Sequence, residues 1–249
     1  MKKKDDQVNQ ARKRFNKDLH TEEYEKIHSD DQHLQQLLDF LNITSGRTYV
    51  DLGTGTGYIG FEIAKQCPDC SVIGIDVADK AIKKNIRKKL EKKLLNIDFY
   101  SYNGITLPLK DSSIDAIIIR YAFHHFPEPK ASIYEFYRVL KENGIIIISD
   151  PIINKLDCED FINKLQELKK DGHIKFYDKK ELIELFNKNN FALVDSFMSK
   201  ITYPREMNVD YDKLLKITSP KILSEYRIKL NGTSIYMTVD VLNIKFRKL

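Results

Sequence analysis

The feature that most constrains the fold of this chain is a series of five short apolar segments with helical patterns between them. They lie at residues 48–52, 71–76, 97–102, 114–120 and 144–150. The runs AIII and GIIII within the last two lack the alternation of a half-exposed strand, which is typical of strands covered on both faces. Helical patterns lie between them at about 57–66, 78–94 and 128–142. We therefore predict an α/β fold, a doubly wound, mainly parallel seven-stranded Rossmann-like sheet with helices on both faces.

The flanking segments add to this core without suggesting a second fold. At 249 residues the chain is long enough for one full α/β domain with additions, so we predict a single domain over 1–249. Residues 1–30, which we expect to form an N-terminal lid segment, precede the core at 31–150. Within 28–43, Ser29 and Gln32 predict a capping box at the start of a helix. In the C-terminal part, 151–249, a helix is expected at 157–170, and Asp178 and Glu181 indicate a second capping box.

Two longer strand candidates end the chain. They lie at 191–203 and 233–246 and are separated by a helical stretch, and the second follows the turn signal Asn231-Gly232. Two strands that run out and back predict an antiparallel edge pair on the otherwise parallel sheet.

Composition excludes several classes of protein. The longest apolar run, IIII at 145–148, is far too short to span a bilayer, and the start MKKKDDQVNQARKR has no apolar signal region. We therefore expect no membrane span and a cytoplasmic location.

Three cysteines fit a reducing compartment. The CPDC segment at 67–70 resembles half of a zinc or redox site, but no second ligand pair accompanies it, so a Pro-Asp turn is favoured and no metal is expected.

The lysine-rich stretch at 80–95 raises the question of a nucleic-acid partner. Net charge is only +5, from 41 basic and 36 acidic residues. Ile82, Ile86, Leu90 and Leu94 recur every four residues, which predicts one apolar stripe on a helix with the lysines on its solvated faces. A nucleic-acid surface is the less favoured alternative, since no RNA-reading motif accompanies the stretch.

The segment TYVDLGTGTGYIGFEIA at 48–64 carries the strongest ligand signal. Gly55, Gly57 and Gly60 satisfy the dinucleotide pattern G-x-G-x-x-G, and Asp76 follows at the end of the second strand. However, Asp51 stands two residues before Gly53, where a carboxylate would repel a diphosphate and would suit an ammonium or sulfonium group. No Gly-Lys-Ser/Thr follows, so a P-loop is also excluded.

At these residues the chain resembles class I S-adenosylmethionine-dependent methyltransferases, and most closely the ubiquinone/menaquinone-biosynthesis type of small-molecule methyltransferase. VDLGTGTGYIG is similar to the first motif of that family. VIGID, YNGITLPLKDSSIDAIII, RYAFHHF and YRVLKENGIIIISD follow in the family's order and spacing. The likeness is close over about residues 30–150. It implies S-adenosyl-L-methionine as cofactor, a cofactor-binding core at 31–150 and acceptor-side elements at 1–30 and 151–249.

The resemblance also implies roles for the residues of the first two strands. Asp51 would hold the amino group of the methionyl part, directly or through water. Gly53, Gly55 and Gly57 would pass the backbone alongside the cofactor. Asp76 would accept both ribose hydroxyls. Alone, each acid is as well explained as a turn or helix cap, but together they flank a glycine turn where such sheets bind ligands.

Further cofactor positions follow the later strands. The resemblance implies Val77 as an apolar face against adenine and Arg120 near the methionine end of the cleft. The family usually has Asp-Ala where this chain has Asn103 and Gly104. Asn103 would accept from the adenine amine through its side-chain oxygen, and Gly104 would keep its backbone N–H.

Acceptor-side residues are harder to assign. His124 and His125 in FHHFPEP are read as packing of a proline turn rather than as a catalytic base, and Asp115 as structural. His173, Tyr24 and His20 are the acceptor-side candidates. No catalytic base is assigned.

The predicted function is methyl transfer from S-adenosylmethionine to a small or medium-sized acceptor by in-line displacement, which positioning and water exclusion accelerate. An RNA or protein methyltransferase and a non-catalytic S-adenosylmethionine-binding module remain alternatives, and an NAD-dependent enzyme is disfavoured by Asp51. The sequence does not identify the acceptor or the oligomeric state.

Overall fold

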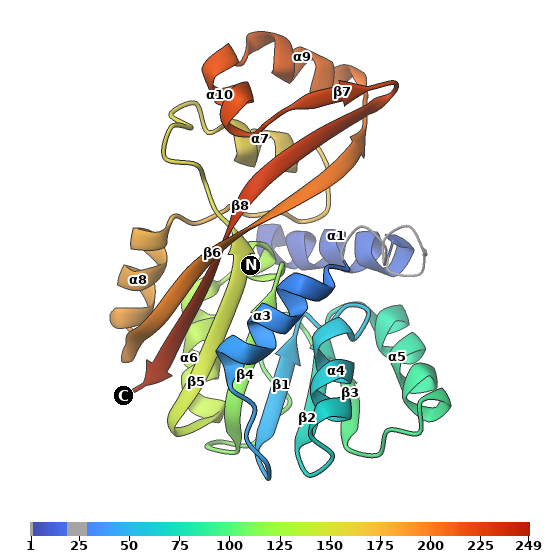
Figure 1. Ribbon diagram of the computed structural model, residues 1–249, viewed down its shortest axis with the longest axis vertical. Helices are drawn as coiled ribbons and strands as arrows, with labels where there is room; N and C mark the ends of the chain where they lie inside the picture. The colour runs from blue at the N-terminus through green and yellow to red at the C-terminus, as the bar shows by residue number, and fades with distance from the viewer. Residues whose placement is uncertain (1, 19–28) are drawn as a thin grey trace.

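A single sheet organises the molecule in the computed structural model, which describes residues 2–18 and 29–249 (Figure 1). The strand order is β3-β2-β1-β4-β5-β8-β6, and the short β7 pairs with β8. The strands are β1 Thr48–Leu52, β2 Ser71–Asp76, β3 Ile97–Ser101, β4 Ile114–Arg120, β5 Leu140–Pro151, β6 Phe191–Glu206, β7 Lys229–Asn231 and β8 Ser234–Lys248. The first five strands in this order, from β3 to β5, all pair in parallel with their neighbours among the five. The doubly wound, mainly parallel sheet is therefore confirmed.

Helices cover both faces of this sheet. They are α1 Lys2–Asp18, α3 Asp31–Leu41, α4 Tyr58–Gln66, α5 Asp79–Glu91, the 3-10 turn η1 Phe123–His125, α6 Pro129–Val139, α7 Phe161–Glu167, α8 Lys179–Asn187, α9 Val209–Ile217 and α10 Pro220–Glu225. Helices α3, α4 and α5 pack on one face, and α6 and α8 on the other. Consecutive strand residues point to opposite sides, so Ile117 lies in one core and Ile118 in the other. This explains why the strand sequences are apolar without alternation.

The C-terminal strands form the predicted antiparallel pair. Strand β8 lies between β5 and β6 and runs antiparallel to both. The far halves of β6 and β8 extend beyond the parallel sheet and, with α7, α9, α10 and β7, enclose a third apolar core (Figure 1). Strand β7 was not predicted; it closes a hairpin with β8 at the expected turn.

Helix boundaries differ from the predictions where a local side chain decides them. The cap of α3 is Asp30, whose Oδ1 accepts from His33 N at 2.9 Å, so the predicted capping box with Ser29 was wrong. The capping box of Asp178 and Glu181 is confirmed. Helix α7 begins only at Phe161, because Asp160 has the left-handed conformation with φ 55°.

The apolar stripe predicted for α5 is only partly buried. Ile82 is 5% exposed, but Ile86 is 42% and Leu90 69% exposed. A spacing of four residues advances about 40° around a helix at each step, because the helix has 3.6 residues per turn. The stripe therefore rotates away from the buried face, which Ala81, Ile82 and Asn85 form.

The CPDC segment forms the predicted turn and also a disulfide. Cys67 ends α4, Cys70 precedes β2, and their sulfur atoms are bonded to each other. The turn lies before the start of β2, whereas the glycine segment lies after the end of β1, so the two occupy opposite ends of the parallel strands. Because the two thiols bond to each other, they do not form half of a zinc site.

Candidate cofactor and acceptor site

A cavity of about 980 Å³, including the space open to solvent, lies beyond the carboxyl ends of β1, β2 and β4. Strand β1 has β2 on one side and β4 on the other, so the strand order reverses beside it, which is where open α/β sheets bind ligands. Predicted cofactor residues on the cavity wall are Asp51, Gly53, Gly55, Asp76, Val77, Gly104 and Arg120.

Asp51 is a buried carboxylate that serves both the loop and the cavity. It is 2% exposed. Its Oδ2 accepts from Thr54 Oγ1 at 2.6 Å and from Gly60 N at 2.9 Å, which ties the glycine loop to the start of α4. Burial raises the pKa of Asp51 to about 6, although these two hydrogen bonds oppose the shift. The hydrogen bonds from Thr54 and Gly60 both use Oδ2, and Asp51 also lines the cavity.

Asp76 ends β2 and lines the same cavity. Its Oδ1 accepts from Ala78 N and its Oδ2 from Gly55 N, both at 2.8 Å. Burial raises its pKa, against the effect of these backbone N–H groups. A carboxylate has about four acceptor sites, so each oxygen can accept a further hydrogen bond from a ligand.

The glycine loop lies so close to its surroundings that a side chain would not fit at Gly53. Its φ is +73°, and a Cβ at this position would be 2.5 Å from Ala122 Cβ. The N–H groups of Gly53 and Thr54 both donate to Ile75 O, at 2.8 and 3.0 Å. The loop is therefore fixed against β2 and against the segment after β4.

Helix α1 forms the roof of the cavity. Val8, Ala11 and Phe15 line it from this helix. Arg12 Nε donates to Val77 O at 3.0 Å, and Lys80 N donates to Asn16 Oδ1 at 2.9 Å, so α1 is fastened to the chain between β2 and α5. In Figure 1 α1 crosses the upper ends of the parallel strands. A ligand in the cavity is therefore shielded from solvent by α1.

Arg120 lies between two aromatic rings at the far end of the cavity. Its guanidinium carbon is 5.1 Å from the ring centre of Tyr58 and 4.1 Å from that of Tyr121. Tyr121 has a φ of 54°, which is rare for a bulky residue. Residues in such sparsely populated backbone conformations cluster at functional sites. His33 stacks on the Tyr121 ring with centroids 5.9 Å apart. The cavity end therefore offers a cation held on aromatic faces.

Three of the predicted residues do not line the cavity. Gly57 is the N-cap of α4. The Asn103 oxygen accepts from Ile105 N and Thr106 N at 2.9 and 2.8 Å, because a side chain of this length readily closes a local turn. His173 lies behind His125, with Nε2 2.9 Å from Asn163 Oδ1. The structure thus gives the Asn103 oxygen to its own loop rather than to the cavity.

The two other acceptor-side candidates, Tyr24 and His20, lie outside the described residues.

The adjacent histidines have different surroundings. His124 N and Nδ1 contact the two oxygens of Asp150, each at 2.8 Å, which ties η1 to β5. Burial disfavours charge on both groups, so the pKa of Asp150 is raised and that of His124 lowered, and the pair is net neutral. His125 lines the cavity and packs on Phe15, and burial lowers its pKa to about 3. His125 is thus a cavity residue for which the sequence favoured a packing role.

Comparison with known proteins places this geometry in a family. Residues 43–205 match the family described as a methyltransferase domain, well over half of the chain. The chain belongs to this methyltransferase family. By class it is an S-adenosylmethionine-dependent methyltransferase, which confirms the family and the enzyme class predicted from the motifs.

Relatives of this methyltransferase have been named in several bacteria. An uncharacterized methyltransferase of Bacillus subtilis, YcgJ, is 25% identical over 208 residues, which cover 81% of this chain and 77% of the relative. A demethylmenaquinone methyltransferase of Thermus thermophilus is 30% identical over 99 residues, which are 40% of this chain and 44% of the relative.

Solved methyltransferase structures share the fold. The crystal structure of YcgJ has a TM-score of 0.77 and 23% identity, covering 88% of this chain and 99% of that one. A putative methyltransferase from Bacillus halodurans has a TM-score of 0.78 and 19% identity, with 87% and 99% covered. A geranyl diphosphate methyltransferase in complex with S-adenosylmethionine has a TM-score of 0.65 and 15% identity, with 88% and 85% covered.

Several wall residues of this methyltransferase were not predicted, and one signal for them existed. Val8, Ala11 and Phe15 occur at i, i+3 and i+7 in an otherwise polar helix, which is the spacing of a single face. Tyr58 and Tyr102 also line the cavity and follow no pattern visible in one sequence, whereas Tyr121 lies beside Arg120 at the end of β4, where the cleft was expected.

Residues 2–18 and 29–249 contain neither a cluster of metal-binding side chains nor a membrane-spanning helix. No group of three or more His, Cys, Asp or Glu side chains is placed to hold a metal ion. No helix in these ranges has the length and apolar character needed to cross a bilayer.

Proposed function

We propose that this methyltransferase binds S-adenosylmethionine in the cavity beneath α1 and methylates a small or medium-sized acceptor by in-line displacement. The observation that carries the proposal is the pair of buried carboxylates, Asp51 and Asp76, at the ends of neighbouring strands along one cavity. Burying two carboxylates costs free energy, and a ligand with a cation at one end and hydroxyl groups at the other offsets that cost. S-adenosylmethionine has both features and supplies an electrophilic methyl group on a sulfonium sulfur.

The amino-acid end of the cofactor fits the wall formed by Asp51 and Arg120. Asp51 is ionised at neutral pH, because its pKa of about 6 lies below it, and it then attracts the ammonium group. Arg120, held on the rings of Tyr58 and Tyr121, is suited to the carboxylate of the same amino acid. Opposite charges on the two ends of this wall thus match a zwitterion.

The nucleoside end fits the wall formed by β2 and α1. Asp76 is proposed to accept from the two ribose hydroxyls. Val77 and Val8 offer apolar surface to adenine, and a Cβ on Gly104 would lie 3.1 Å from a methyl group of Val8, so a glycine keeps this side of the cavity open. The adenine contact expected from the Asn103 oxygen is not carried into the proposal, because that oxygen already accepts two backbone hydrogen bonds.

The remaining wall is proposed to receive the acceptor. Tyr121 and His125 line it, and the lowered pKa of His125 keeps this ring neutral at pH 7. A neutral ring can orient an acceptor through a hydrogen bond without adding charge beside the sulfonium. The roof formed by α1 excludes water, and the fixed loop at Gly53 holds the reacting groups in line. Relatives named for demethylmenaquinone and geranyl diphosphate support an acceptor in the range of small molecules.

Calorimetric titration with S-adenosylmethionine and S-adenosylhomocysteine tests the binding step. The wild-type chain is expected to bind both, and Asp76→Ala to abolish measurable binding because the ribose loses its acceptors. Asp69→Ala removes a carboxylate from the CPDC turn at the opposite ends of the strands and should bind like the wild type. A folded wild-type chain that binds neither compound contradicts the proposal.

Turnover separates an enzyme on small molecules from the alternatives. Release of S-adenosylhomocysteine with a panel of small quinone, phenol, amine and thiol acceptors is expected. Turnover only with RNA or protein supports the alternative substrates, and binding without turnover on any panel member supports a non-catalytic module.

A further inference from the structure

Helix α5 and the connection that follows it expose apolar and basic side chains. Lys83, Ile86, Arg87 and Leu90 occupy positions i, i+3, i+4 and i+7 of α5, which form one helix face, and all four are exposed. The chain after α5 leads into the edge strand β3, and Lys89 Nζ of α5 donates to Asp98 Oδ1 of this strand at 2.5 Å. We call the four residues, together with Leu95 in the connection from α5 to β3, the α5–β3 surface.

The apolar members of the α5–β3 surface are unusually accessible. Leu90 is 69%, Leu95 90% and Ile86 42% exposed. Single exposed apolar side chains are common on any protein and require no explanation. Here three of them gather on α5 and on the connection after it, and such grouped apolar residues with a polar rim mark interaction sites.

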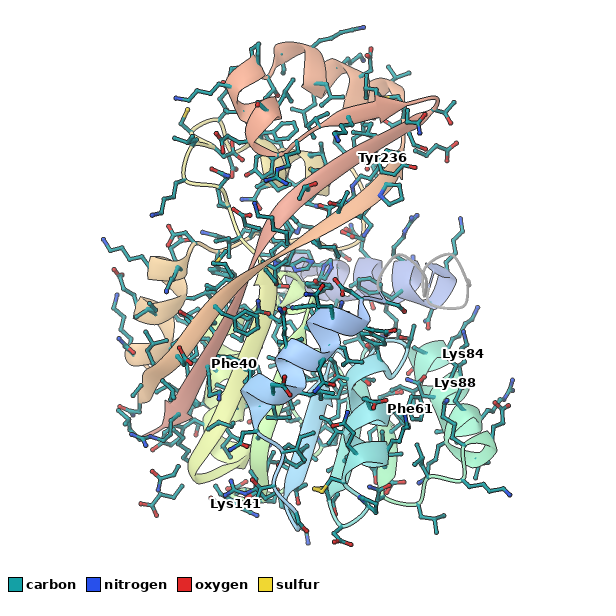
Figure 2. The ribbon with its side chains drawn as sticks, in the orientation of Figure 1. Phe40, Phe61, Lys84, Lys88, Lys141 and Tyr236 are labelled. Atoms are coloured by element: carbon teal, nitrogen blue, oxygen red, sulfur yellow. A yellow bond between two sulfur atoms is a disulfide. The ribbon has the colours of Figure 1, made fainter. Side chains whose placement is uncertain are left out.

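The same segment has a large excess of basic residues. Residues 79–95 contain eight basic and two acidic residues, an excess of six, while the complete chain has a net charge of +5. Lys92 and Lys93 at the end of α5 are exposed. Figure 2 labels Lys84 and Lys88 on α5 at the outer edge of the molecule. The charges of the other residues sum to −1, although α1 is also basic, with seven basic and three acidic residues in 2–18.

We propose that the α5–β3 surface docks on a lipid bilayer with anionic headgroups. Lysine and arginine near such a bilayer are attracted by the negative surface potential, and leucine and isoleucine between them enter the boundary between headgroups and acyl chains. A nucleic acid fits less well, because phosphates match the basic residues but leave the aliphatic side chains without a partner. An anionic bilayer matches both the basic and the apolar side chains that this helix face exposes.

The location of this surface connects docking with the cavity. Helix α5 begins directly after Asp76 and Val77, and Lys80 N donates to Asn16 Oδ1 of the roof helix. Docking through α5 therefore brings the bilayer next to one end of α1. The proposal does not depend on which acceptor is methylated.

Sedimentation of the full-length chain with vesicles tests this surface. The wild type is expected to bind phosphatidylglycerol vesicles at low salt and not phosphatidylcholine vesicles. The variant Lys83→Gln/Arg87→Gln/Lys92→Gln should partition about a hundredfold more weakly, which corresponds to about 3 kcal/mol at about 1 kcal/mol for each charge. Leu90→Gln, which keeps every charge, should weaken partitioning about tenfold because it removes one inserted side chain.

A matched control separates this surface from net charge alone. Lys180→Gln/Lys188→Gln/Lys216→Gln removes the same number of charges from exposed lysines of α8, its end and α9. This variant should bind phosphatidylglycerol vesicles within about twofold of the wild type. Thermal unfolding of every variant verifies the fold.

Three results overturn the proposal. The first is no binding to phosphatidylglycerol vesicles at low salt. The second is an equal loss of binding in the control variant, which reports net charge only. The third is that the wild type binds single-stranded polyuridylate but no vesicles, while the three-charge variant loses polyuridylate binding and Leu90→Gln retains it. This pattern identifies a nucleic-acid surface.

Discussion

Asp51 has to stay ionised for the proposed function although its surroundings favour the neutral form. Its pKa is raised from 3.8 to about 6 by burial. A carboxyl group whose pKa is higher in the folded state adds stability below its unfolded pKa and loses that contribution as the pH rises through the folded value. At pH 7 the charged Asp51 therefore costs the unliganded protein up to about 3 kcal/mol.

Asp51→Asn should stabilise the unliganded protein at pH 7 while it weakens cofactor binding. Asparagine keeps an oxygen for Thr54 and Gly60 but carries no charge, so the free energy of unfolding should rise by about 1 to 3 kcal/mol and lose the part of its pH dependence that Asp51 contributes between about 4 and 6. Chemical denaturation at several pH values measures this. A variant less stable than the wild type at pH 7 contradicts the assigned ionisation.

Cofactor affinity should follow the same titration. In the wild type, the dissociation constant for S-adenosylhomocysteine should rise as the pH falls below about 6, because protonated Asp51 no longer attracts the ammonium group. In Asp51→Asn the affinity should be low and insensitive to pH over this range. Calorimetry at matched ionic strength distinguishes the two behaviours.

Gly53→Ala tests the close approach of the glycine loop. The left-handed backbone costs an alanine about 1 kcal/mol, and overlap with Ala122 adds about 1 to 3 kcal/mol. Gly46→Ala is the matched control, because its φ of +74° is nearly that of Gly53 and nothing lies within 4 Å. Gly53→Ala should be the less stable variant and should lose cofactor binding; equal behaviour of the two variants would exclude a special role for this approach.

At the scale of elements, α1 packs closely against Gly172 of the C-terminal half. Gly172 has φ +80°, and a Cβ there would be 2.6 Å from Gln7 O and 3.0 Å from Ala11 N, both backbone atoms of α1. Backbone atoms cannot rotate away as a side chain does. The helix itself must therefore shift if Gly172 is replaced.

Gly172→Ala should consequently raise the dissociation constant for S-adenosylhomocysteine at least about tenfold, because the roof no longer closes, which is about 1.4 kcal/mol. Gly232→Ala also places alanine at positive φ, +58°, but meets nothing within 4 Å. It should bind the cofactor like the wild type. Unchanged affinity in Gly172→Ala would show that α1 is not part of the binding site.

The elements differ in how well the sequence alone predicts them. Strands β1, β2 and β4 have the predicted bounds, because each is an apolar run that a polar residue or glycine terminates. The exposure of Ile86 and Leu90 in α5 was not predicted, because the spacing of apolar residues defines a stripe on a helix but not which side of the helix faces the sheet. Helix α1 was underestimated for the same reason: its apolar face of Val8, Ala11 and Phe15 gains meaning only when a cavity lies beneath it.

The candidate site shows the same division. Asp51 and Asp76 were predictable because strand ends in a parallel sheet meet at one edge. Asn103 and His173 were not, because local turns and buried partners compete for their polar atoms. The two remaining acceptor-side candidates stay predictions, since they fall outside the described ranges.

At the scale of the whole molecule, the two ends of the parallel sheet carry different features. The carboxyl ends of the strands hold the cavity with its two buried carboxylates and its roof, and the third core lies beyond them. The amino ends carry the Cys67–Cys70 disulfide. The basic edge of α5 runs along the side of the sheet. The proposed chemistry is therefore confined to one end, and the proposed docking to one edge.

The most direct measurement is a crystal structure of the chain with S-adenosylhomocysteine. The account predicts the ribose hydroxyls within hydrogen-bond distance of Asp76, the ammonium group at Asp51, and α1 closed over the adenine. Electron density for the nucleoside at any other place, or a ribose held without Asp76, would contradict it.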